Sequence, residues 1–188
     1  MTIQIVLLMT TIFPSLMNPL LRFDRGSIYE GEIWRLVTGH FVHLGPYHAA
    51  MNIFGLILIC SIFPDAIDSN SLPKATLFIA VSVSVALLIC SPHLDWYLGL
   101  SGVLHGLFAF AIVMHLTARI SILWLALAAL IVKVIYEQMP GYDASYLTNY
   151  IHAPVAVDAH IYGTVSGCFW GVLVRCRPTL PQKSRTPP

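Results

Sequence analysis

Charged residues are scarce in this sequence. Asp, Glu, Lys and Arg make up only 10% of the 188 residues, whereas about a quarter is usual for a soluble domain. Hydrophobic residues make up 57%, and the mean hydropathy is +0.76. The formal net charge is +1, and the lack of a basic cluster outside the short C-terminal tail argues against a nucleic-acid partner. The composition therefore excludes an ordinary soluble domain and indicates an integral membrane protein.

Motifs for metal and disulfide chemistry are also missing. The H-E-x-x-H signature of zinc proteases does not occur, and His43 and His48 have the wrong spacing for two ligands on one helical face. No C-x-x-C motif or disulfide framework is visible. The four cysteines fall within or at the ends of apolar stretches: Cys60, Cys90, Cys168 and Cys176. We therefore expect no metal and no cofactor.

Long apolar stretches dominate what is present. A membrane-spanning helix needs about 20 apolar residues, and six stretches of about this length predict an all-α membrane protein with six transmembrane helices. The first lacks the basic region and the cleavage site of a signal peptide, so we expect it to be retained. The six are Ile3–Leu21, Pro46–Pro64, Ala75 to about Pro92, about Leu98 to Leu116, Ile120–Tyr136 and about Pro154 to Val174.

The distribution of Lys and Arg predicts the orientation. Six of these ten residues fall on the side of the termini, four of them in or next to the C-terminal tail. Because positive charge favours the cytoplasmic side, both termini are predicted to be cytoplasmic. Residues 22–45, 93–97 and 137–153 would then face outward. We expect a membrane domain over residues 1–176 and a disordered, basic, Pro-rich cytoplasmic tail over residues 177–188.

Three of the expected spans carry polar residues at a similar depth. Polar side chains in a span are costly and tend to mark function. His48 and Asn52, four residues apart, share one helical face and lie within about 10 Å of the outer end of their span. Ser101 lies about 5 Å, and His160 about 9 Å, from the outer ends of theirs. A serine near a helix start with a histidine and further donors on other helices supplies the nucleophile, base and oxyanion donors of nucleophilic catalysis.

Three motifs carry a resemblance to a known family. GLSG (residues 99–102) resembles the G-x-S-G motif of the rhomboid intramembrane serine proteases. AHIYGTVSG (159–167) resembles their A-H-x-x-G-x-x-x-G motif, and WRLVTGHFVHLGPYHAAMN (34–52) is similar to their W-R element and H-x-x-x-x-H-x-x-x-N pattern. The resemblance implies a six-helix rhomboid-like bundle.

The same resemblance implies a catalytic dyad in which His160 takes the proton of Ser101. Gly163, one turn past His160, would let the sixth span pack closely against the fourth. The residues expected at the oxyanion hole and the adjoining binding site are His48, Asn52, Gly99, Leu100 and the backbone N–H of Ser101.

His105 departs from the family pattern. Many rhomboids have an aromatic residue four positions after the serine, where it stacks on the catalytic histidine. The fuller stretch GLSGVLHG (99–106) resembles the rhombosortase branch, whose members are thought to cleave a C-terminal Gly-Gly anchoring signal of exported proteins. His105 could itself be the base, but we favour His160 because His105 shares a helix with Ser101 and lies about 6 Å deeper.

Two further residues have less defined roles. His43 is either a functional donor at the same site or only a capping side chain. Asp158 lies about 200° around the helix from His160, so we expect a loop-facing or interhelical role rather than that of a triad acid.

We therefore predict a rhombosortase-type intramembrane serine endopeptidase in a bacterial cytoplasmic membrane, with a site that opens to the outer side. Its partners would be the lipid bilayer and a membrane-anchored protein substrate. The alternatives are a general rhomboid protease with other single-span substrates, a rhomboid-like protein that binds membrane clients without cutting them, and a transporter. A transporter would need charged or broken-helix sites at the midplane, whereas the polar residues here are shallow.

Overall fold

The computed structural model describes residues 14–117, 121–145 and 155–176, and these are mostly helical. Short elements come first: α2 (Pro14–Leu21), β1 (Phe23–Asp24), α3 (Arg25–Tyr29), α4 (Arg35–Thr38) and the 3-10 helix η1 (Gly39–Phe41). The long helices are α5 (Pro46–Ile62), α6 (Ser71–Cys90), α7 (Ser101–His115), α8 (Ser121–Tyr136) and α10 (Val157–Arg175). Strand β2 (Trp96–Tyr97) precedes α7 and pairs antiparallel with β1.

Each of the last five expected spans coincides with one long helix. The start of the first expected span and the predicted tail lie outside the described residues. By length and apolarity, α6 is the one described helix able to cross a membrane. A second span is present if residues 35–62, which bend by 97° at a break, are counted as a single membrane-crossing segment. The 16 residues of α8 extend only about 24 Å, less than the roughly 30 Å hydrocarbon core. The number of six spans therefore stays a prediction.

Large apolar side chains remain exposed on the outer faces of the long helices. Phe54 of α5 is 67% exposed, Ile89 of α6 is 72% exposed and Leu125 of α8 is 65% exposed. Helices that are apolar on their outer as well as their inner faces suit lipid rather than water as their solvent.

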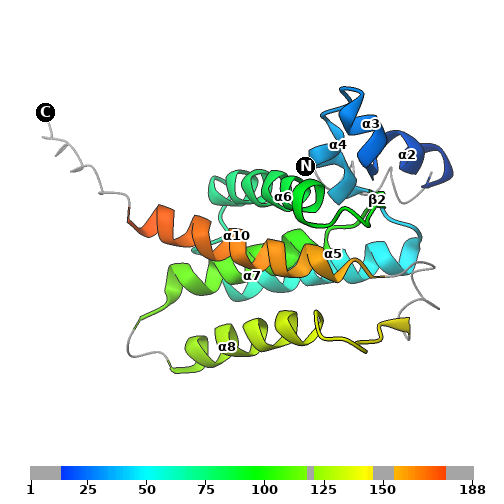
Figure 1. Ribbon diagram of the computed structural model, residues 1–188. Helices are drawn as coiled ribbons and strands as arrows, with labels where there is room; N and C mark the ends of the chain where they lie inside the picture. The colour runs from blue at the N-terminus through cyan, green and yellow to red at the C-terminus, as the bar shows by residue number, and fades with distance from the viewer. Residues whose placement is uncertain (1–13, 118–120, 146–154, 177–188) are drawn as a thin grey trace, which may run out of the picture.

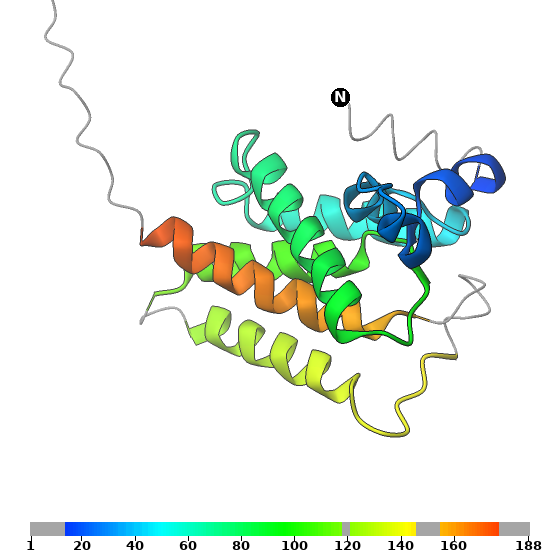
Figure 2. The same ribbon diagram turned by 45° about the horizontal axis from the view of Figure 1, so that its top comes forward.

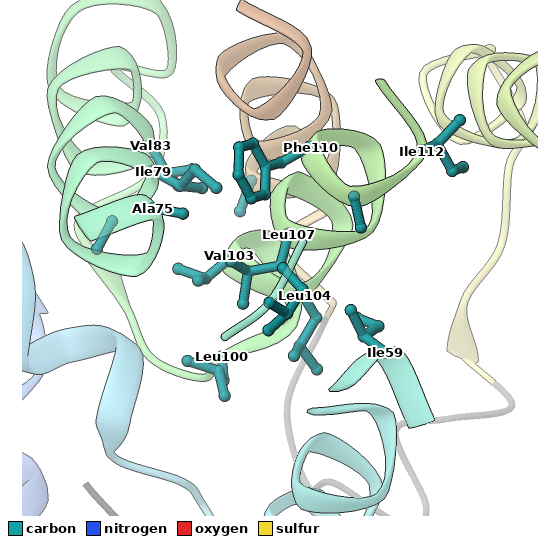
Figure 3. Packing of buried hydrophobic residues seen from close by; sticks show 14 of the residues in the cluster. Ile59, Ala75, Ile79, Val83, Leu100, Val103, Leu104, Leu107, Phe110 and Ile112 are labelled. Carbon is teal, nitrogen blue, oxygen red and sulfur yellow. The ribbon is translucent and has the colours of Figure 1, made fainter. Parts of the chain in front are cut away.

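Helix α7 lies in the middle of the bundle. It contacts α5, α6, α8 and α10, the last most extensively, and the ribbon views show α8 at the edge (Figures 1 and 2). Figure 3 shows the apolar side chains of α7 filling the space toward α5 and α6. Those labelled are Leu100, Val103, Leu104, Leu107, Phe110 and Ile112 from α7 and its start, Ala75, Ile79 and Val83 from α6, and Ile59 from α5.

Glycines bring α7 and α10 into backbone contact. A Cβ atom at Gly102 would lie 2.8 Å from the Ala159 carbonyl oxygen, and one at Gly106 would lie 2.7 Å from the Gly163 carbonyl oxygen. A Cβ atom at Gly163 would overlap the Gly102 carbonyl. Because only residues without a side chain allow so close an approach, these glycines determine the distance between the starts of the two helices.

Arg25 ties the N-terminal elements to the loop before α7. Its guanidinium donates hydrogen bonds of 2.8–3.1 Å to carbonyls in the last turn of α6 and in the segment that follows it, where carbonyls lack some or all of their partners within the helix. The pairing of Phe23 with Tyr97 holds the same loop from the other side. The carbonyl acceptors are those of Leu87, Leu88, Ser91 and Leu94.

Candidate active site

The loop that enters α7 presents Ser101 to a cavity of about 280 Å³. Gly99 has φ +113°, a conformation that glycine adopts without strain. Its N–H donates to the Gly39 carbonyl at 3.0 Å, and its carbonyl accepts from the Tyr97 hydroxyl at 2.5 Å. These two bonds fix the backbone just before α7. Ser101 is the first residue of this helix, where backbone N–H groups have no partner within the helix.

Ser101 and His160 lie within hydrogen-bonding distance. The Ser101 Oγ is 3.0 Å from the Nε2 of His160, which is buried in the first turn of α10. The two residues are 59 positions apart in the sequence. Gly102 and Gly163 bring the backbones of α7 and α10 into contact at this level, and this contact brings together Ser101 and His160, both predicted from the sequence.

His105 stacks on His160 and does not reach the serine hydroxyl. The two rings are 4.1 Å apart between centroids and 14° from parallel. The Nδ1 of His105 donates to the Ser101 carbonyl at 2.7 Å, and its Nε2 accepts from the Lys133 ammonium at 2.9 Å. Both ring nitrogens are thus engaged away from the Ser101 Oγ. His105 has the stacked position that the family resemblance gives to an aromatic residue.

Glu137 is a site residue that the sequence analysis missed. It follows α8 directly and is 6% exposed. One carboxylate oxygen accepts from the Nδ1 of His160 at 2.9 Å, and the other accepts from the Lys133 ammonium at 2.6 Å. Burial opposes ionisation of Glu137, but the contacts with His160 and Lys133 outweigh it and lower the pKa to about 2. The available signal was the pairing of Lys133 with an acid four residues later at a helix end.

His105, Glu137 and His160 also form the kind of cluster that can ligate a metal, since their ligand atoms lie within 4.8 Å of one another. The two rings are stacked nearly parallel, so their lone pairs lie in separate planes and do not converge at the roughly 2.1 Å that zinc requires. The Lys133 ammonium already supplies a cation between His105 and Glu137. These three residues fit a hydrogen-bonded network better than a metal centre.

His48 and Asn52 lie beside the backbone that precedes Ser101. A Cβ atom at Gly99 would be 2.7 Å from the Nε2 of His48 and 3.9 Å from the Nδ2 of Asn52. His48 lines the cavity together with Ser101. Among the described residues, no partner is found for the buried Nδ2 of Asn52 or the Nδ1 of His48. Leu100, by contrast, directs its side chain into the apolar core and is 2% exposed (Figure 3).

His43 is buried behind His48. Their rings meet edge to face at 4.9 Å between centroids and 84°. The carbonyl of His43 accepts from the Asn18 side chain at 3.1 Å, and its ring nitrogens have no partner within the described part of the chain. His43 thus supports the His48 ring and, unlike it, does not line the cavity.

Asp158 faces the loop that follows α6, one of the two roles expected from the sequence. Its carboxylate accepts from the Ser91 hydroxyl and lies 3.5 Å from the Nε2 of His93. Ser91 also contacts the Tyr162 hydroxyl at 3.0 Å. The acid that meets His160 is therefore Glu137 and not Asp158.

Comparison with known proteins agrees with the motifs. The family model of the rhomboid domain matches residues 30–177, a range that includes every residue of the site described above. No curated protein matches the chain. The predicted family is thereby confirmed: the chain belongs to the rhomboid family and is an integral membrane protein, an intramembrane serine protease that hydrolyses peptide bonds of membrane proteins within the bilayer.

Proposed function

We propose that Ser101 is the nucleophile and His160 the general base of this protease. The observation that carries the proposal is the distance of 3.0 Å between the Ser101 Oγ and the His160 Nε2 at the edge of the cavity. The other ring nitrogen of His160 faces a carboxylate, which only accepts while ionised, so Nδ1 carries the proton and Nε2 is free to accept one.

The reaction then follows from this tautomer. His160 takes the hydroxyl proton as the Ser101 Oγ bonds to the scissile carbonyl carbon, and it returns the proton to the leaving amine as the C–N bond breaks. Water, activated by the same imidazole, hydrolyses the acyl-enzyme and restores the hydroxyl of Ser101.

His48, Asn52 and the backbone N–H of Ser101 are the proposed oxyanion donors. Buried polar groups are normally hydrogen-bonded, yet Asn52 Nδ2 has no partner within the described residues. The side chains of His48 and Asn52 converge on Gly99, two residues before the nucleophile. An oxyanion that forms beside Ser101 would meet donors fixed in advance of the reaction.

The proposed substrate is an exported protein with a C-terminal Gly-Gly-type anchor, as in the rhombosortase branch. His105 at the fourth position after the nucleophile supports this assignment. The cavity is lined by residues 93–98 and 155–156, part of which is predicted to face outward, so we propose that the site opens to the outer side of a bacterial cytoplasmic membrane. General single-span proteins are the alternative substrates.

Covalent labelling with a fluorophosphonate tests the nucleophile. Ser101→Ala should abolish labelling, whereas Ser61→Ala, which alters an exposed serine of α5, should label like the wild type. Labelling that persists in Ser101→Ala would refute the assignment.

A histidine series tests the base. His160→Ala should reduce cleavage to the level of Ser101→Ala. His115→Ala is the matched control, because His115 makes the same type of bond to the carbonyl four residues earlier as His105 does, at the other end of α7. If His105→Ala instead falls to the Ser101→Ala level and His160→Ala does not, His105 is the base.

Two reporters with identical soluble domains test the substrate class. One ends in Gly-Gly, an apolar span and a basic tail, and the other carries an unrelated single span without Gly-Gly. Cleavage restricted to the first supports the rhombosortase assignment, and equal cleavage of both favours a general rhomboid protease.

A further inference from the structure

We propose that Glu137 is a positioning residue that extends the Ser101–His160 pair into a Ser–His–Glu triad. This inference rests on the proposed function of Ser101 and His160. Glu137 touches neither the serine nor the cavity, so it would act through the imidazole of His160 alone.

The geometry places the carboxylate where a triad acid is needed. The Nε2 of His160 faces Ser101 at 3.0 Å, and its Nδ1 donates to Glu137 at 2.9 Å. The side chains of His160 and Glu137 are 7% and 6% exposed, respectively. A buried carboxylate in this position selects the reactive tautomer, fixes the ring orientation and stabilises the imidazolium that forms when Ser101 gives up its proton.

Lys133 holds Glu137 in this position from the opposite side. Its ammonium donates to the second carboxylate oxygen at 2.6 Å and to the Nε2 of His105 at 2.9 Å. His105 in turn donates through Nδ1 to the Ser101 carbonyl and stacks on His160. The contacts form a closed circuit over α7, α8 and α10, in which the described charged and titratable groups facing Glu137 are Lys133, His105 and His160.

A purely structural ion pair does not explain this arrangement. An isolated pair of Lys and Glu four residues apart stabilises a helix when both side chains are exposed. Here the Lys133 side chain is 47% exposed and that of Glu137 only 6%. The carboxylate thus turns inward to the imidazole, while the lysine reaches back from the helix surface.

The negative charge of Glu137 and the positive charge of Lys133 should have opposite effects on the pH dependence of cleavage. Glu137 is already ionised at any pH at which the protein is assayed, because its pKa lies at about 2. Protonation of Glu137 therefore does not set the acid limb of the rate profile. Loss of the negative charge of Glu137 removes the group that stabilises the imidazolium formed when Ser101 gives up its proton. Loss of the Lys133 charge leaves the carboxylate uncompensated, so its attraction for that imidazolium becomes stronger.

The test measures pH–rate profiles of the full-length protein in liposomes with the cleavable reporter described above. We expect Glu137→Gln to lower kcat about 10- to 100-fold with little change in KM, and to move the acid limb down by about one to two pH units, a change equivalent to this fold-change. Glu137→Asp, which keeps the charge, should restore part of the lost kcat. Lys133→Met should move the acid limb upward. A structural role would not produce shifts of opposite sign.

Unchanged profiles in Glu137→Gln and Lys133→Met would overturn the triad. If Glu137→Gln does not fold, Lys133→Met decides alone: an upward shift supports the triad, and no shift refutes it. Fluorophosphonate labelling of Ser101→Ala distinguishes failure of the triad from failure of the proposed nucleophile. Its loss together with an unaltered Glu137→Gln profile would refute only Glu137, whereas its persistence would refute the nucleophile itself.

Discussion

Replacement of Gly163 by alanine tests whether contact between the α7 and α10 backbones sets the distance between Ser101 and His160. The added methyl group would overlap the Gly102 carbonyl oxygen and lie 2.8 Å from the carbonyl carbon, whereas ordinary contacts begin at 3.4 Å. Both clashing atoms belong to the backbone, so no side chain can rotate away and the helices must separate.

The expected loss follows from the length of the hydrogen bond. A separation of about 1 Å would stretch the 3.0 Å contact between Ser101 and His160 beyond hydrogen-bonding distance, and a misplacement of this size costs about 10²-fold in rate. Overpacking of this kind also costs about 1–3 kcal/mol of stability. The rate should therefore fall by more than the loss of folded protein explains.

Kinetics and unfolding of Gly163→Ala, measured on the same preparation, check this expectation. Gly171→Ala is the matched control, because its methyl group would meet the side chain of Val113 at 2.8 Å, and Gly171 lies about 12 Å further along the same helix. It should lose stability but not kcat. Wild-type kcat in folded Gly163→Ala, or an equal loss of kcat in Gly171→Ala, would show that the backbone contact does not set the distance between Ser101 and His160.

Three further predictions concern the loop that Arg25 holds, the turn at Gly99 and the effect of a metal chelator. Arg25→Gln should lower the free energy of unfolding by about 2–4 kcal/mol, because hydrogen bonds from a charged donor to partly buried carbonyls are lost; an unchanged denaturation midpoint would contradict this. Gly99→Ala should reduce fluorophosphonate labelling about 10²-fold because its methyl group collides with His48, whereas Gly31→Ala, also at positive φ but with open space around it, should bear only the backbone strain and label normally. EDTA should leave the labelling rate unchanged, since Lys133 supplies the cation beside Glu137; loss of labelling with EDTA and its recovery with Zn²⁺ would show that a metal is required.

Helix positions were predictable because lipid imposes a simple rule. A segment that crosses a membrane must satisfy its backbone hydrogen bonds internally and present apolar side chains, so apolar stretches and helices coincide. The expected span Pro46–Pro64 corresponds to α5, Pro46–Ile62, and Ile120–Tyr136 to α8, Ser121–Tyr136. The start of α6 differs: it begins at Ser71 and not at Ala75, because a lysine such as Lys74 is tolerated in a first turn, where its long side chain can reach polar surroundings.

The candidate site was predictable only where its residues belong to local motifs. Ser101 with Gly99, and His48 with Asn52, are positioned by spacing along one turn or one helix, and the order of the motifs identified the family that contains His160. Their proximity could be inferred from depth. The stacking of His105 on His160 agrees with its position four residues after the serine, although the direction of its hydrogen bonds does not follow from that spacing.

The membrane class, the protease family and the candidate nucleophile and base follow from the amino-acid sequence, because each depends on composition or on residues at short fixed spacings. The partner of the His160 Nδ1, in contrast, is evident only from the folded protein. In the sequence Glu137 is a single acid after an apolar helix, near a lysine, and such a residue is usually solvated. Packing of α8 beside α7 and α10 buries its carboxylate against an imidazole 23 positions away, and the environment of a charge, which sets its effect on a neighbouring proton, is a property of the folded protein.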